Sequence, residues 1–194
     1  HGVVIALIVN VTLIPFMGLI PIYASLEFDG GTGLTGAMSS AQGIGAILGG
    51  IAVTMLAAHM RRSRLMALMF AWLTVSLLAY AQAPNTVTVV LCAAALGAGT
   101  SAFFVTTSSI IQRDAPPESR GRIMSLNQAS MGVSYGIGLM LIGSIGDLVN
   151  LRVAFTIGAL VMAGAFLLAR SRSNTWYPAI DGVPVEPNNR LVNA

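Results

Sequence analysis

The feature that most constrains this chain is a series of six apolar segments, each long enough to cross a lipid bilayer. A helix rises about 1.5 Å per residue, so about 20 apolar residues match a hydrocarbon core of about 30 Å. Short connections with turn residues separate the segments, which implies antiparallel neighbouring helices. The segments cover approximately residues 3–25, 34–60, 65–82, 86–112, 123–146 and 153–169.

The composition requires that lipid surrounds most of the chain. Of the 194 residues, 55% are hydrophobic and only 9% are charged, whereas a soluble domain has about 25% charged residues. Lipid offers no partner for free backbone N–H and C=O groups, so the apolar segments must be helical, and none alternates like a barrel strand. We therefore predict an all-α membrane protein in which residues 1–170 form six transmembrane helices.

The distribution of arginines predicts the orientation of these helices. Arginines gather at alternate ends of the segments, and those ends should be cytoplasmic. The small net charge of +3 and the absence of Lys argue against nucleic acid as a partner. The arginine-rich ends hold Arg61, Arg62, Arg64, Arg113, Arg120, Arg122, Arg170 and Arg172, whereas the opposite loops hold Glu27, Asp29, Asp147 and a single arginine, Arg152.

The two ends of the sequence differ from the six segments. The chain begins at His1 within an apolar stretch, without an initiator Met or a signal peptide, so we expect it to come from a longer protein. Residues 171–194 are polar, contain three prolines and lack helical periodicity. We interpret them as a largely disordered cytoplasmic tail.

Polar side chains are unevenly distributed among the segments. The third and sixth are nearly purely apolar, as expected of helices that face mostly lipid. Burying an unpartnered amide or hydroxyl costs on the order of several kcal/mol. The polar side chains of the other four segments should therefore surround a polar cavity. Alternatively, these side chains join the helices through interhelical hydrogen bonds. The four segments carry Asn10, Thr12, Ser39, Gln42, Thr100, Ser101, Thr106, Thr107, Asn127, Gln128, Ser134 and Tyr135, among others.

Glycine and proline indicate where helices approach or bend. Gly45 and Gly49, like Gly132 and Gly136, have the GxxxG spacing that lets helix backbones touch. Close packing is the preferred interpretation, although smooth faces also suit helices that slide or rock. Pro21 interrupts the first segment and permits a bend, which is either a static kink or part of a substrate path.

The chemistry of enzymes is absent from the sequence. Gly132 to Gly136 matches the GxSxG pattern of serine hydrolases, but Ser134 lies in mid-helix and no His follows it. There is no metal-ligand cluster, and the single cysteine, Cys92, cannot form an internal disulfide. No charged residue lies within a span, so these residues offer no proton relay. We predict no enzymatic activity, cofactor or metal.

Three stretches resemble the C-terminal half of a major facilitator superfamily transporter, helices seven to twelve of twelve. Residues 19–24 (LIPIYA) resemble the end of helix seven in drug and siderophore exporters. Residues 116–126 (PPESRGRIMSL) are very similar to the entry into helix eleven in the branch that contains the enterobactin exporter and macrolide efflux proteins. Residues 143–147 (GSIGD) are similar to the end of that helix. The loop after the second segment departs from many relatives, because Ala58 stands where an Asp is common.

The resemblance implies a cavity lined by the first, second, fourth and fifth segments, which is the division that the polar residues also indicate. We predict efflux of a small amphipathic compound by alternating access across a bacterial inner membrane, together with an N-terminal six-helix half of the same protein that carries any proton-coupling residue. The candidate substrate-binding residues are Asn10, Met17, Gln42, Phe103, Thr107, Asn127, Met131 and Tyr135. The candidate residues of a cytoplasmic gate are Arg61, Arg62, Arg64, Asp114, Arg120 and Arg122.

A membrane scaffold that does not transport is the alternative from another functional class. Such a protein needs neither a continuous cavity nor a second half. The arginines also have a simpler role, because any one of them can anchor a helix end at lipid headgroups.

The orientation can be tested by labelling single cysteines in the full-length protein lacking Cys92. We expect Asn85→Cys to react with a membrane-impermeant maleimide in intact cells, and Ser119→Cys to react only after permeabilisation, because Ser119 adjoins the arginine-rich loop. The reverse pattern would contradict the predicted orientation.

Overall fold

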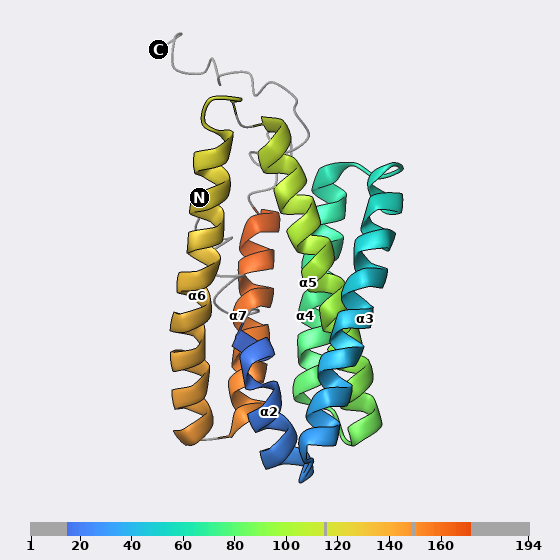
Figure 1. The fold of residues 1–194 in the computed structure, drawn as a ribbon, viewed down its shortest axis with the longest axis vertical. Helices are drawn as coiled ribbons and strands as arrows, with labels where there is room; N and C mark the ends of the chain where they lie inside the picture. The colour runs from blue at the N-terminus through green and yellow to red at the C-terminus, as the bar shows by residue number, and fades with distance from the viewer. Residues whose placement is uncertain (1–14, 115, 149, 172–194) are drawn as a thin grey trace.

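The computed structural model describes residues 15–114, 116–148 and 150–171. These residues form six helices and no strand (Figure 1). The N-terminal part of the first predicted span and residues 172–194 of the predicted tail lie outside the described residues. The helices are α2 (Pro15–Phe28), α3 (Thr32–Ala57), α4 (Arg62–Ala81), α5 (Thr86–Asp114), α6 (Arg120–Leu148) and α7 (Leu151–Ser171).

The length and hydropathy of these helices confirm the predicted fold class. Within the described residues, four helices contain stretches long and apolar enough to cross a membrane, namely Thr32–Ala57, Arg64–Ala81, Thr86–Ile110 and Arg120–Gly146. Two shorter apolar stretches, Phe16–Phe28 and Leu151–Gly164, complete the set. The chain therefore forms an all-α membrane bundle.

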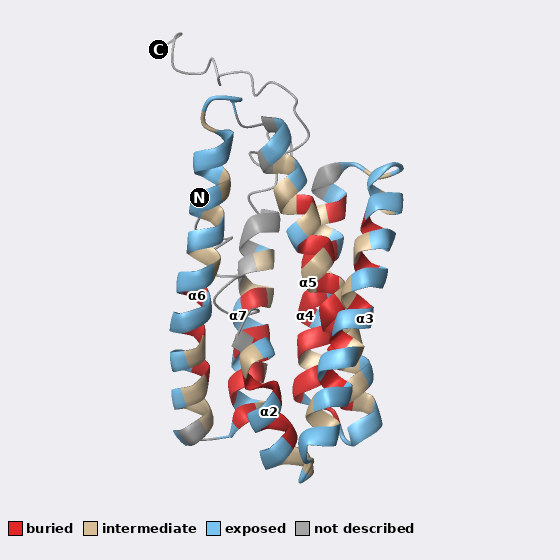
Figure 2. Cartoon of the chain, viewed as in Figure 1, coloured by how far each residue is buried: buried red, intermediate tan, exposed pale blue. Residues whose placement is uncertain are grey.

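Burial differs strongly between the helices (Figure 2). Half of the apolar stretch of α4 is buried inside the bundle, against 22% of α3 and 17% of α6. We expected α4 and α7, the third and sixth predicted segments, to face mostly lipid, but α4 packs between α5 and α7. Large apolar side chains of α3, such as Ile47 and Met55, are instead exposed.

The helices α3 and α5 form the closest pair because glycine removes the side chains between them. A Cβ atom on Gly45 or Gly49 would overlap the backbone of Ala94 or Ala98, and one on Gly97 would overlap the backbone of α3. Small residues allow this approach, and dispersion forces then hold the backbones together. The other predicted glycine pair, Gly132 and Gly136 of α6, differs. A Cβ atom added at either of these glycines would meet nothing within 4 Å.

Aromatic side chains join α2 to α4 and α7 on the side away from α3. The ring of Tyr23 stacks on Tyr80 at 4.9 Å and meets the edge of Phe155 at 5.2 Å. The Tyr23 hydroxyl donates a hydrogen bond of 3.0 Å to the carbonyl of Tyr80. Aromatic pairs of this kind contribute about 0.5–1.5 kcal/mol each beyond the burial of area, so this cluster fixes α2 against the back of the bundle.

Adding a methyl group at the α3–α5 contact should destabilise the protein. We expect Gly45→Ala to cost about 1–3 kcal/mol, because the rigid backbone at Ala94 cannot give way to the new Cβ. Thermal melting of the purified full-length protein in detergent measures this loss. The matched control is Gly36→Ala in the same helix, where nothing lies within 4 Å; equal melting temperatures for the two variants would contradict the packing.

Candidate functional site

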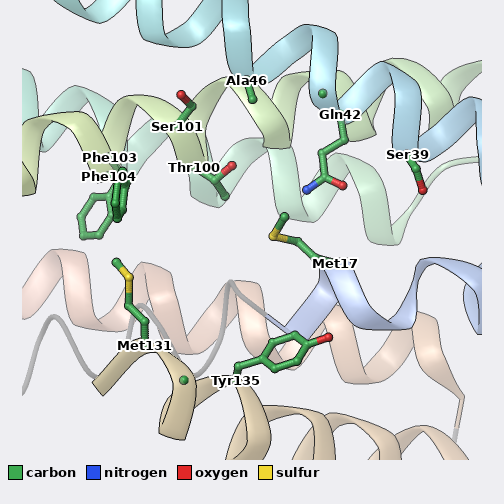
Figure 3. A pocket seen from close by; sticks show the side chains of 12 residues that line it. Met17, Ser39, Gln42, Ala46, Thr100, Ser101, Phe103, Phe104, Met131 and Tyr135 are labelled. Carbon is green, nitrogen blue, oxygen red and sulfur yellow. The ribbon is translucent and has the colours of Figure 1, made fainter. Parts of the chain in front are cut away.

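A cavity of about 680 Å³ lies between α2, α3, α5 and α6 (Figure 3). Its volume is within the range of about 300–1,000 Å³ that is typical of sites for small molecules. These are the four helices in which polar residues concentrate. The lining residues are Met17, Ser39, Gln42, Gly43, Ala46, Thr100, Ser101, Phe103, Phe104, Met131, Gly132 and Tyr135.

One wall of the cavity belongs to the α3–α5 pair. Ser39, Gln42 and Ala46 follow one another at helical spacing on α3, so they share one face. Gln42 is 8% exposed, and its backbone packs against Gly97 of α5 while its amide extends into the cavity (Figure 3). The glycine contact therefore positions the only side-chain amide among the lining residues.

The opposite wall belongs to α2 and α6. Met17 of α2 projects toward Gln42, and Met131 and Tyr135 project from α6 (Figure 3). Methionine is flexible and polarisable, so it can adapt to ligands of different shapes. This wall offers contact area, with the Tyr135 phenol as its polar group.

The two ends of the cavity differ in chemistry. Ser39 and Gln42 lie at one end, whereas Phe103, Phe104 and Met131 gather at the other (Figure 3). The polar end is nearer the start of α3, and the aromatic end is nearer the end of α5, where the arginine-rich loop begins. The cavity thus matches an amphipathic molecule with one polar and one apolar end.

Several hydroxyls counted as polar in the sequence bond to their own helix. Thr100, which lines the cavity, donates to the carbonyls of Leu96 and Gly97 at 3.0 and 2.9 Å. Thr106 donates likewise to Ala102 at 2.8 Å. Such bonds satisfy a hydroxyl without a second helix, so the cavity is more apolar than the residue types alone indicate.

Only some of the eight candidate substrate-binding residues line the cavity. Five line the cavity: Met17, Gln42, Phe103, Met131 and Tyr135. Thr107 and Asn127 lie on lining helices but are not among the lining residues, and Asn10 lies outside the described residues. Other lining residues were not among the eight candidates, notably Ser39 and Thr100, each three residues from a candidate, and Phe104, which directly follows Phe103.

The candidate gate residues lie at the arginine-rich end, where α3 connects to α4 and α5 connects to α6 (Figure 1). Arg61 precedes α4, Arg120 begins α6, and both are exposed, as are Arg64 and Arg122. The side chains of Arg62 and Asp114 lie outside the described residues. The expected pairing of an arginine with Asp114 therefore stays a prediction.

At the other end of the bundle, an ion pair joins α2 to α7. Arg152 Nε donates to Glu27 Oε2 at 2.7 Å, and the guanidinium lies 5.6 Å from the centre of the Phe28 ring. The Glu27 side chain is 14% exposed, so water screens the pair less than a surface salt bridge. This contact holds the start of α7 against the end of α2.

A family model for the Major Facilitator Superfamily matches residues 2–187. The chain belongs to this superfamily. Its members are secondary transporters, not enzymes. No curated protein matches the chain.

Breaking the ion pair should lower the stability of the transporter. We expect Glu27→Gln to cost on the order of 1 kcal/mol, because Arg152 remains partly buried without its carboxylate, although partial exposure limits the loss. The midpoint of thermal unfolding measures the change. Asp29→Asn, which neutralises an exposed neighbour, is the control; an equal loss in both variants would contradict a specific pair.

Proposed function

We propose that this protein exports a small amphipathic compound by alternating access, with the cavity between α2, α3, α5 and α6 as part of the substrate path. The carrying observation is the cavity itself, which is walled by four helices and has a polar and an aromatic end. In this proposal Gln42 bonds the polar group of the substrate, while Phe103, Phe104 and Met131 contact its apolar part.

The exposed apolar faces support a second six-helix half of the same protein. Ile44, Ile47, Leu48 and Ile51 of α3 are each more than half exposed, as are Leu126 and Val133 of α6. None of these residues is among those that line the cavity, and they lie on the helices that the rest of the bundle covers least. In this proposal a second half packs against these two helices, and the resemblance of PPESRGRIMSL to helix eleven supports the assignment of this chain as the C-terminal half.

We propose that the second half carries the residues that couple transport to its energy source. Among the described residues, no Asp, Glu, Lys or Arg lines the cavity, and we propose that the carboxylate that couples transport to protons lies in the second half. We assign the arginine-rich loops and the tail to the cytoplasm of a bacterial cell, following the bias of arginine over these loops. The transporter then works as an antiporter of the inner membrane.

The scaffold alternative makes a different demand on the structure. A non-transporting protein needs no pocket that opens between four of its helices. The cavity thus favours transport over a purely structural role.

Replacing the cavity amide should impair export. In a bacterium without its own multidrug pumps, we expect the full-length protein to lower the accumulation of fluorescent amphipathic compounds, with a protonophore restoring it. Gln42→Leu should weaken substrate binding by about 1–3 kcal/mol through the lost hydrogen bond, where each ~1.4 kcal/mol is a factor of ten in affinity.

The matched control is Gln128→Leu, which removes an exposed amide that does not line the cavity. Export that is lost in Gln42→Leu and kept in Gln128→Leu supports the proposed site. Unchanged export in both variants would place the substrate elsewhere, and no export of any compound by the parent protein would favour the scaffold.

A further inference from the structure

Gly18 of α2 lies against Tyr135 of α6, a residue that lines the cavity. A Cβ atom on Gly18 would overlap the Tyr135 hydroxyl and would lie 3.1 Å from the ring atom that carries it. It would also lie 3.0 Å from a methyl group of Leu139. Gly18 therefore leaves the space in which the hydroxyl end of the Tyr135 side chain rests.

The position of Tyr135 affects how much of the cavity is open. Its ring extends alongside α2, below Met17, and does not cross toward α3 (Figure 3). Tyr135 is 36% exposed, so part of this residue borders open space. A ring displaced from Gly18 can turn toward that open space, where it would occupy part of the cavity.

We propose that Gly18 is a specificity-determining residue that sets the width of the cavity by seating Tyr135 against α2. The ligands that depend on this width are amphipathic compounds with a bulky ring system, whereas slender compounds pass with or without it. The proposal rests on the proposed function in that it takes this cavity as the substrate path.

Other glycines of the cavity do not have this property. Gly43 and Gly132 also line it, but a Cβ on either meets nothing within 4 Å. A methyl group there adds only its own volume. At Gly18 the same methyl group displaces a whole aromatic side chain, so its effect on the width should be much larger.

Labelling of a cysteine in the cavity tests the width without requiring transport. In the full-length protein in membranes, with Cys92→Ala, Ser39→Cys places one thiol among the lining residues. The measured quantity is the rate of reaction with bulky fluorescein maleimide divided by the rate with small N-ethylmaleimide. Gly18→Ala should lower this ratio several-fold, and Gly132→Ala should change it little.

Variants of Tyr135, the residue that a methyl group at Gly18 would meet, provide the decisive comparison. In Tyr135→Phe the atom nearest the new Cβ is gone, so adding Gly18→Ala should leave the ratio close to that of Tyr135→Phe alone. A clash of the new methyl group with backbone, as at Gly45, would predict no such rescue. Coupling of this kind between contacting residues appears as non-additivity in a double-mutant cycle.

Three outcomes would overturn the proposal. The ratio is unchanged or raised by Gly18→Ala, the double variant behaves like Gly18→Ala alone, or Tyr135→Ala fails to raise the ratio. The last variant keeps the test decisive even if Gly18→Ala does not accumulate in the membrane. Because labelling needs no substrate or energy, a protein that exports nothing can still pass or fail this test, which separates the two proposals.

Discussion

The contact between α3 and α5 is the interaction on which the cavity depends. Gly45, Gly49 and Gly97 remove the side chains that would separate the two backbones. With the helices this close, the face of α3 that carries Gln42 is presented to α2 and α6 across an open space. In lipid there is little hydrophobic force between helices, so shape complementarity of this kind is what keeps one wall in place.

The fold was largely predictable because lipid leaves few solutions. The lengths of the apolar segments and the short connections between them predicted helices close to those observed, such as α3 over Thr32–Ala57 and α5 over Thr86–Asp114. The burial of individual helices was harder to predict. Composition alone does not distinguish a helix surrounded by lipid from one surrounded by apolar neighbours, and α4 belongs to the second kind.

The site was predictable at the level of helices and less so at the level of residues. The polar count selected the four lining helices, and Gln42 followed because a buried amide is costly. Sequence reasoning selected Phe103 but not Phe104, because consecutive residues of a helix point about 100° apart and the sequence does not show that the cavity reaches both. It overvalued hydroxyls such as Thr100 and Thr106, whose bonds to their own helix are visible only in three dimensions.

The hydroxyls bonded to their own helix have a consequence for how such a protein diverges. A threonine of this kind can become valine at the cost of one hydrogen bond within its own helix, and no hydrogen bond between helices is lost. The glycines of the α3–α5 contact have no such latitude, because every other residue adds an atom where backbone already lies. As sequences diverge, many of these threonines should therefore be replaced, whereas the glycines of the α3–α5 contact should be kept. Distant homologues are then best recognised by the spacing of these glycines.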